Sequence, residues 1–270
     1  MIRPRGLILA MACLLALAGQ EAMAAKCGNN AGGFSAWLEQ TKKEAVAAGI
    51  SPKVVSSALN GVTYDPRVIK LDRNQKHFRL SFDQFYATRA RPLEGQARSR
   101  LKSNAALLNK IEARYGVPGE VIVAIWGLET SFGGNTGNMS VIRSLATLAY
   151  DCRRTDFFTK ELYAALSIIQ RGDMTSAQMV GAWAGELGQT QFLATSYVRF
   201  AVDFDGNGRR DLIRSTADAL ASTANYLKGY GWQKGQPYGP GTANYAVIGK
   251  WNKATVYQQT IAALAAKIRN

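Results

Sequence analysis

The chain has 270 residues, of which 47% are hydrophobic and 19% are charged, and its net charge is +14 at neutral pH. This composition excludes a disordered chain and provides enough apolar surface for one large or two small globular domains. The surplus of positive charge favours an anionic polymer as partner, such as nucleic acid, anionic lipid or a cell-wall polymer with free carboxylates, or it only aids solubility.

The first residues have the three parts of an export signal. Arg3 and Arg5 precede an apolar run, and Ala22-Met23-Ala24 is a small-x-small cleavage site. We predict a signal peptide over residues 1–24, a mature chain from Ala25 with a net charge of +13, and a periplasmic location, which argues against nucleic acid as the partner. No later stretch has the roughly 20 apolar residues of a membrane span.

Two cysteines remain after removal of the signal peptide, Cys27 and Cys152. In an oxidising compartment an even pair favours a disulfide, and two unpaired thiols are the alternative. Cys27 lacks the small residue and leucine that a bacterial lipoprotein signal would place before it, so we expect no lipid anchor.

Apolar spacing and capping residues predict a mainly α-helical chain. Ser51-Pro52 is typical of an N-cap followed by proline at the first helical position. Strand signals are scarce, and residues 245–248 are one short candidate. The predicted helices cover residues 34–48, 52–59, 93–115, 147–150, 157–170, 174–183, 215–229 and 257–268, and a further helix begins at Pro118 and runs to the glycines at 133 and 134.

One predicted helix is apolar all round and contains a single acid near its end. Residues 121–128 have no polar face, which is typical of a buried helix, and Gly133 and Gly134 favour its termination. Burial and the partial negative charges of the last helical carbonyls both raise the pKa of Glu129. A general acid at neutral pH needs such a pKa. The alternative is a glutamate that reaches solvent or pairs with an arginine.

Four ordered stretches resemble the lytic murein transglycosylase B family. The first, Trp126-Gly-Leu-Glu129-Thr-Ser-Phe-Gly133, is similar to the segment that carries the catalytic glutamate of that family. The others are Trp183-Ala-Gly-Glu-Leu-Gly-Gln-Thr-Gln-Phe192, Ala201-Val-Asp-Phe-Asp-Gly-Asn-Gly208 and Asn244-Tyr-Ala-Val-Ile-Gly-Lys-Trp-Asn252. The resemblance covers nearly all of the predicted mature chain, and four motifs in order are more specific than any one.

The resemblance implies a lysozyme-like, mainly α fold and a peptidoglycan lyase. Residues 25–270 would form the catalytic domain, with an N-terminal helical part over about 25–115, a core over about 116–270 and no appended peptidoglycan-binding domain. Glu129 would cleave the β-1,4 bond between N-acetylmuramic acid (MurNAc) and N-acetylglucosamine (GlcNAc), first as acid and then as base. The MurNAc C6 hydroxyl would close a 1,6-anhydro ring without water, and catalysis would need no cofactor.

The same resemblance implies a set of substrate-binding residues. Gln189 and Gln191 resemble cleft amides, which both donate and accept hydrogen bonds. Arg153 and Arg154 resemble basic residues thought to meet the carboxylates of the peptide stem. Further residues that resemble cleft positions are Tyr226, Asn252 and Tyr257. For each of them packing or a surface position is the alternative.

Three positions depart from the family pattern. Ala182 stands where serine is usual, so a contact that orients Glu129 is missing or supplied differently. Trp251 stands where tyrosine is common, which changes any hydroxyl contact. Glu186 stands where many members have a small or apolar residue. It is either a second catalytic carboxylate, which favours hydrolysis, or a structural acid bonded to backbone N–H groups.

The segment from Asp203 to Arg209 matches the first half of a calcium loop. Asp203, Asp205 and Asn207 supply oxygens at positions 1, 3 and 5, and the carbonyl of Arg209 is at position 7. The glutamate expected at position 12 is absent, and the resemblance suggests that a later acid, Asp218, closes the loop around a structural Ca²⁺. An Asp/Asn/Gly turn without metal is the alternative.

From these motifs we predict a periplasmic lytic transglycosylase that binds peptidoglycan strands, and two alternatives remain. One is a true muramidase that admits water, and the other is a non-catalytic peptidoglycan-binding scaffold protein. The single histidine, His77, excludes a histidine-rich zinc site, and no phosphate-binding Gly-x-x-x-x-Gly-Lys pattern occurs.

Overall fold

The computed structural model describes residues 27–74 and 80–269, and the predicted signal peptide and His77 lie outside these residues. The fold is mainly α, as predicted. Strands β1 (Met139–Ser140) and β2 (Val180–Gly181) pair antiparallel, with Met139 opposite Gly181. The short helices are η1 Ala31–Gly33, η3 Arg91–Leu93, η4 Ser176–Gln178 and a π-helical turn, η2 Tyr86–Ala90. The α-helices are α1 Phe34–Ala47, α2 Pro52–Leu59, α3 Pro66–Arg73, α4 Phe82–Phe85, α5 Glu94–Ser103, α6 Ala105–Tyr115, α7 Gly119–Thr130, α8 Val141–Tyr150, α9 Thr155–Gln170, α10 Ala194–Phe200, α11 Thr216–Gly229, α12 Ala243–Trp251 and α13 Thr255–Arg269.

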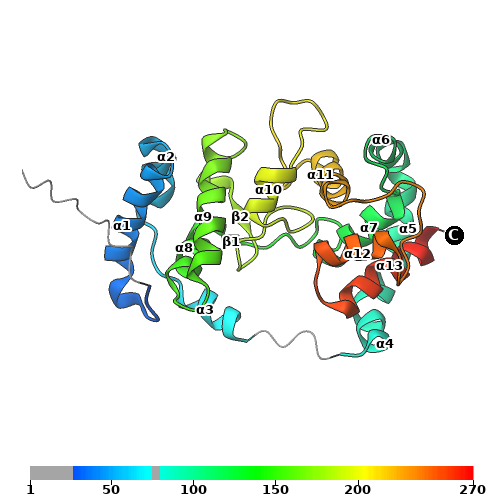
Figure 1. The fold of residues 1–270 in the computed structure, drawn as a ribbon, viewed down its shortest axis with the longest axis horizontal. Helices are drawn as coiled ribbons and strands as arrows, with labels where there is room; N and C mark the ends of the chain where they lie inside the picture. Colours follow the sequence, from blue (N-terminus) through cyan, green and yellow to red (C-terminus); the bar gives the residue numbers. More distant parts are fainter. Residues whose placement is uncertain (1–26, 75–79, 270) are drawn as a thin grey trace, which may run out of the picture.

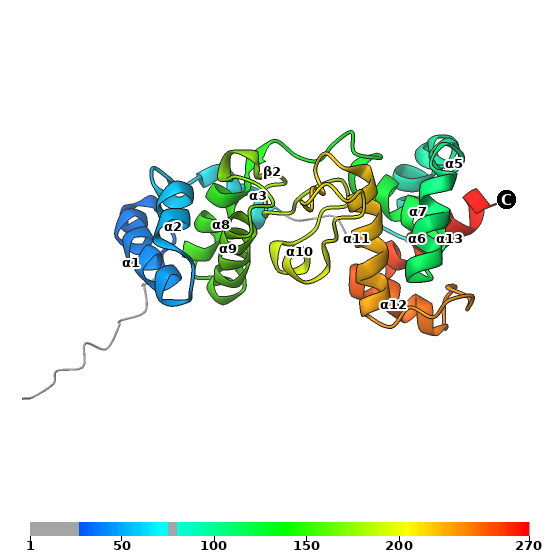
Figure 2. The ribbon, with the colours of Figure 1, turned by 90° about the horizontal axis from the view of Figure 1, so that it is seen from above.

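The helices are arranged along an elongated molecule (Figure 1). Helices α1 and α2 lie at one end beside α8 and α9, α10 lies in the middle, and α5, α6, α7 and α13 lie at the other end; the view from above gives the same order (Figure 2). The chain therefore visits the two ends alternately. Helices α5 and α6 pack against α7, α11 and α13, whereas α8 packs against α1 and α3. The subdivision at residue 115 remains a prediction.

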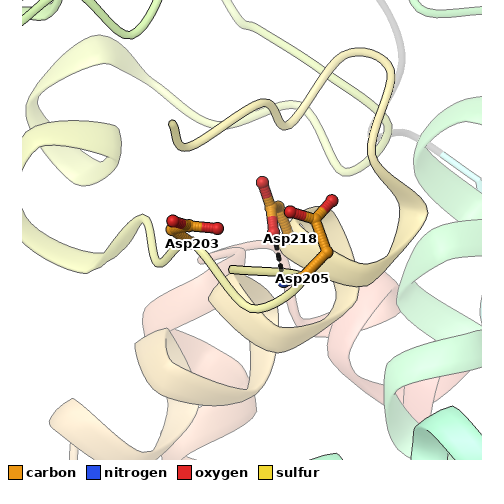
Figure 3. A group of neighbouring side chains, drawn as sticks. All are labelled: Asp203, Asp205 and Asp218. Atoms are coloured by element: carbon orange, nitrogen blue, oxygen red, sulfur yellow. Dashed lines mark hydrogen bonds between the residues drawn. The ribbon is translucent and has the colours of Figure 1, made fainter. Parts of the chain in front are cut away.

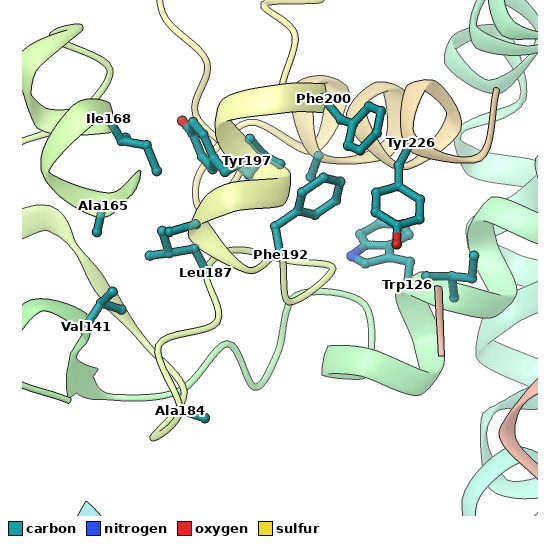
Figure 4. Packing of buried hydrophobic residues seen from close by; sticks show 14 of the residues in the cluster. Trp126, Val141, Ala165, Ile168, Ala184, Leu187, Phe192, Tyr197, Phe200 and Tyr226 are labelled. Carbon is teal, nitrogen blue, oxygen red and sulfur yellow. The ribbon is translucent and has the colours of Figure 1, made fainter. Parts of the chain in front are cut away.

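A continuous core joins the two ends through α10. Tyr197 and Phe200 of α10 are buried together with Phe192 before it and Tyr226 of α11. Figure 4 shows these rings between residues of α9 and Trp126 of α7. The ring centroids of Phe200 and Tyr226 are 4.9 Å apart and those of Phe192 and Tyr226 are 6.0 Å apart, in edge-on arrangements that aromatic pairs favour.

The predicted disulfide between Cys27 and Cys152 is confirmed. It fixes the start of the described chain to the connection between α8 and α9. Beside it, the Gly28 N–H donates to the Tyr150 carbonyl at 2.9 Å, and a Cβ on Gly28 would lie 2.0 Å from the Tyr150 hydroxyl oxygen. Glycine is thus required where the backbone passes over this tyrosine.

Three local predictions were wrong. The helix expected over 93–115 is interrupted at Asn104, where the backbone leaves the helical conformation with φ of −106° and ψ of 15°, and the Asn104 N–H and side-chain amide both donate to the Arg100 carbonyl. Residues 245–248 lie in α12, because Thr242 caps this helix by accepting from the Tyr245 N–H. Residues 174–183 form η4 and β2 instead of a helix, and the β2 backbone pairs with β1.

No helix within residues 27–74 and 80–269 is both long and apolar enough to cross a membrane.

Candidate active site

Glu129 lies in the last turn of α7, and the chain reverses directly after it. Ser131 and Phe132 adopt left-handed backbone conformations, with φ of 51° and 62°, so α7 ends before the glycines that were expected to stop it. The Phe132 ring folds back beneath Gly127, where a Cβ would lie only 2.8 Å from it, and meets Trp126 edge-on. This packing explains the glycine and fixes the helix end that carries Glu129.

The Glu129 carboxylate is held by two aromatic donors from the last part of the chain. Trp251 Nε1 donates to Glu129 Oε1 at 2.9 Å, and the Tyr257 hydroxyl donates to the same oxygen at 2.8 Å. Within the described residues no lysine or arginine forms an ion pair with Glu129. Because both bonds end on Oε1, Oε2 remains available to a substrate.

Burial raises the pKa of Glu129 to about 7. The bonds from Trp251 and Tyr257 act in the opposite direction, Glu186 raises the pKa further and Arg89 lowers it. Burial also raises the pKa of the Tyr257 phenol well above its ordinary value, so this residue is a donor throughout the neutral range. A carboxyl with a pKa near 7 exchanges a proton in both directions at neutral pH.

A pocket of about 370 Å³ opens over Glu129. Its walls come from α7, the segment that follows β2, α10, α11 and the end of α12. The lining residues are Glu129, Ala182, Trp183, Glu186, Gln191, Phe192, Leu193, Ser196, Tyr226, Trp251 and Asn252.

Of the residues predicted to contact substrate, Gln191, Tyr226 and Asn252 line this pocket. Gln191 Nε2 donates to the carbonyls of Thr136 and Gly188, and Asn252 Oδ1 accepts from the Ala254 N–H. These bonds leave the Gln191 oxygen and the Asn252 amide nitrogen for a ligand.

Tyr226 has a supporting contact as well as a place in the lining. Its hydroxyl donates to the Lys250 carbonyl at 2.6 Å, and its ring lies edge-on to Trp251 at 5.0 Å. Tyr226 thereby braces the residue that donates to Glu129.

Tyr257 is not part of the pocket lining but contacts Glu129 through its hydroxyl, and the other predicted residues lie elsewhere. Gln189 is buried and does not line the pocket; its side chain donates to the Ile213 carbonyl and accepts from Thr216. Arg153 and Arg154 form ion pairs with Asp72 near the disulfide and do not line the pocket. The structure thus brings only part of the predicted set to Glu129.

Ser196, Leu193 and the donor role of Trp251 were missed from the sequence. Alanine at position 182, where serine is usual, predicts that the contact orienting Glu129 is missing or supplied differently. In the structure, Trp251 and Tyr257 provide the hydrogen bonds that orient Glu129. The position of Trp251, in the motif that ends at Asn252, was the only available signal.

The Asp203 loop brings three carboxylates together (Figure 3). Asp203, Asp205 and Asp218 each place an oxygen within 4.8 Å of the others. Asp203 accepts from the N–H groups of Gly206, Asn207 and Gly208, and the buried Asp218 accepts from those of Phe204, Asp205 and Asp211. Burial raises the pKa of Asp218, and the neighbouring Asp205 adds to this effect. A hard divalent cation suits such an oxygen cluster.

Comparisons with known proteins agree with the motifs. The transglycosylase SLT domain family model matches residues 33–242. Over 129 residues the chain is 40% identical to membrane-bound lytic murein transglycosylase B from Escherichia coli K12, a match that covers 47% of this chain and 36% of that relative. The match thus spans about a third of the length of this curated relative.

Solved structures extend the comparison over most of the chain. SltB3 from Pseudomonas aeruginosa, in complex with NAG-anhNAM-pentapeptide, is 34% identical with a TM-score of 0.82, covering 88% of this chain and 80% of that one. Escherichia coli SLT35 in complex with calcium is 23% identical with a TM-score of 0.76, covering 93% and 97%. The expected lysozyme-like, mainly α fold is confirmed by these likenesses. The chain belongs to the transglycosylase SLT domain family.

Proposed function

We propose that this protein is a lytic transglycosylase that cleaves the MurNAc–GlcNAc β-1,4 bond of peptidoglycan, with Glu129 as its single acid and base. The observation that carries the proposal is the Glu129 carboxyl itself: it opens into a pocket, its pKa is about 7, and Oε1 is fixed by two donors. Its free oxygen is suited to give and then take one proton.

In the proposed reaction, Glu129 Oε2–H donates its proton to the glycosidic oxygen as the bond from C1 to that oxygen breaks. The substrate N-acetyl group helps to carry the positive charge at C1. The resulting carboxylate, stabilised by Trp251 and Tyr257, then takes the proton of the MurNAc C6 hydroxyl as O6 bonds to C1. The proton returns to Glu129, and the products are 1,6-anhydro-MurNAc and a free GlcNAc end.

The relatives support this choice of substrate. Pseudomonas aeruginosa SltB3 binds both NAG-NAM-pentapeptide and NAG-anhNAM-pentapeptide. In the present chain Gln191, Tyr226 and Asn252 would contact sugar. Arg153 and Arg154 would meet stem carboxylates with the parts of their side chains that remain exposed beside Asp72, 43% and 38% respectively.

Hydrolysis is the second candidate, because Glu186 places another carboxyl in the same pocket. A second carboxylate can activate water, which gives a reducing MurNAc end in place of the anhydro sugar. Mass spectrometry of digested peptidoglycan separates the two reactions, since the anhydro product is lighter by one water. A mainly hydrated product overturns the transglycosylase assignment, and no product at all points to the scaffold alternative.

We also propose a periplasmic location and a structural calcium ion. The disulfide suits an oxidising compartment, as does the signal-peptide pattern of residues 1–24. Asp203, Asp205 and Asp218 would hold the ion with the Asn207 side chain and the Arg209 carbonyl, and Escherichia coli SLT35 has been solved with calcium. The ion would brace the chain between α10 and α11 and takes no part in the sugar chemistry.

A further inference from the structure

The pocket contains a second carboxyl, on a backbone that is held by hydrogen bonds and close packing. The Ala182 N–H donates to the Glu186 carbonyl at 3.0 Å, and Leu187 exchanges two 2.8 Å backbone bonds with Phe192. Gly185, with φ of 91°, leaves no room for a side chain, because a Cβ there would lie 2.4 Å from Leu145. This packing fixes the position from which the Glu186 side chain enters the pocket.

The Glu186 side chain ends in an unsatisfied oxygen. Oε2 is buried and has no hydrogen-bond partner among the described residues, while the residue lines the same pocket as Glu129. Glu186 forms no ion pair within the described residues, and Glu161, an acid that acts on it electrostatically, is already bonded to the N–H and hydroxyl of Thr195. A polar oxygen that is buried without a partner is unfavourable, so a ligand that lets the carboxyl group turn and form a hydrogen bond gains affinity.

We propose that Glu186 contacts the substrate, and that its carboxyl group hydrogen-bonds a hydroxyl or acetamido oxygen of the sugar bound over Glu129. This inference rests on the proposed function, because it requires an N-acetylated sugar in the pocket. It makes Glu186 a binding residue for the reaction that Glu129 carries out.

The surroundings of Glu186 favour the carboxylic acid as donor. Burial raises its pKa, and Glu161 adds to this effect, whereas the N–H groups of Glu186 and Ala184 and the charge of Arg154 oppose it. Glu129 is a further acid within electrostatic range, and two neighbouring carboxyls resist simultaneous ionisation.

A donor at this position complements the rest of the lining. The Gln191 amide nitrogen is bonded to Thr136 and Gly188, so this side chain offers an acceptor, and the Tyr226 hydroxyl is bonded to Lys250. The Asn252 amide offers one donor. An acidic Glu186 would add a second, which a sugar with several acceptor oxygens can use.

The test compares Glu186→Gln with Glu186→Ala in the full chain. An amide keeps a donor in the same place and has no charge, so we expect Glu186→Gln to bind soluble peptidoglycan strands within about threefold of wild type. Glu186→Ala should bind about tenfold more weakly, the effect of one or two hydrogen bonds, with KM raised and kcat nearly unchanged. Glu120→Ala, in the first turn of α7 and outside the pocket, is the control.

Binding is measured by calorimetry in a Glu129→Gln background, so that strands are not cleaved, and kinetics with Glu129 intact. If Glu186→Ala binds strands as tightly as its parent, the proposal is overturned. It is also overturned if Glu186→Gln and Glu186→Ala lose the same amount of strand affinity, which would mean that Glu186 acts as an ionised carboxylate and not as a donor. Loss of strand binding in Glu186→Ala with retention in Glu186→Gln supports it even if wild type proves inactive, so this inference and the proposed activity fail separately.

Discussion

Two regions of the molecule contain buried carboxyl groups, and the partners of these groups are charged in one region and neutral in the other. In the arginine–aspartate cluster, Asp72 forms ion pairs with Arg73, Arg153 and Arg154, and Arg73 also pairs with Asp151. In the Glu129 pocket, the acid faces Trp251 and Tyr257, with no ion pair among the described residues. The ion pairs of the cluster connect the end of α3 to the segment between α8 and α9. Around Glu129 the contacts are made by neutral aromatic donors instead.

The difference shows that the partners of a buried acid determine its role. Although burial alone would raise the pKa of Asp151, the bonds from Arg73 and the Arg153 N–H and the charges of both arginines together outweigh it and lower the pKa, so this acid is an anion at neutral pH. For Glu129 the neutral aromatic donors do not outweigh burial, and the pKa stays at about 7. A guanidinium beside Glu129 would remove the proton that the proposed chemistry needs.

The largest expected effect is on turnover. Glu129→Gln should keep the fold and strand binding but lower kcat by about 10²–10⁴, because an amide cannot deliver a proton to the leaving oxygen. Turnover is measured by release of soluble muropeptides. Glu120→Gln, in the same helix, should match wild type. Near-wild-type turnover by purified Glu129→Gln contradicts the assignment.

The matching change in the cluster should affect stability instead. Asp72→Ala leaves three guanidinium groups without their shared buried partner and should lower the free energy of unfolding by about 3–5 kcal/mol. Urea denaturation measures the change, and the exposed Asp83→Ala is the control. A loss below about 1 kcal/mol would mean that the ion pairs are held too loosely to matter.

The two regions should also respond to pH with opposite signs. Glu129 has a folded pKa of about 7 against an ordinary 4.5, so the folded protein binds the extra proton and the stability due to this group falls as pH rises from 4.5 to 7, by roughly 3 kcal/mol. Asp151, with a lowered pKa, contributes stability above its ordinary 3.8 that is lost as pH falls below it.

Glu129→Gln tests that sign, because it removes the titrating group. It should melt at a higher temperature than wild type at pH 8 and at nearly the same temperature at pH 5. An equal shift at both pH values would show that Glu129 titrates normally.

Calcium bound to the Asp203 loop should stabilise the folded protein by about as much as the Glu129 titration changes its stability, or by less. At a concentration one hundred times Kd, binding to the folded state alone gives about 2.7 kcal/mol, which raises Tm by roughly 5–10 °C. Asp203→Ala and Asp205→Ala should abolish the rise, and the exposed Asp156→Ala should keep it. If calorimetry at millimolar calcium detects no binding and chelator leaves Tm unchanged, the loop is a turn without metal.

The smallest effect concerns the donors to Glu129. Trp251→Phe removes a bond that favours the ionised carboxyl, so the pKa of Glu129 should rise by roughly 0.4–1 unit and the alkaline limb of the rate profile should move to higher pH. The pH dependence of kcat/KM measures it. A shift towards lower pH would show that the indole does not act through this bond.

Local patterns predicted a large part of this molecule. The Ser51 cap, the apolar α7 with its terminal acid and the carboxylates of the Asp203 loop all depend on residues that are close in sequence. The convergence of Trp251 and Tyr257 on Glu129 depends on how α12 and α13 pack, more than 120 residues away along the chain. Residues 245–248 show the same limit, because β-branched and aromatic residues favour a strand until a cap and tertiary contacts decide for a helix.

The two residues that donate to Glu129 are synthesised well after it. The ribosome makes Glu129 long before Trp251 and Tyr257, which lie on the last two helices of the described chain. A partly synthesised chain therefore carries the acid without the bonds that orient it. Because Trp251 and Asn252 also complete the pocket lining, the proposed activity would begin only after the last helices of the described chain have folded, without a separate inhibitor.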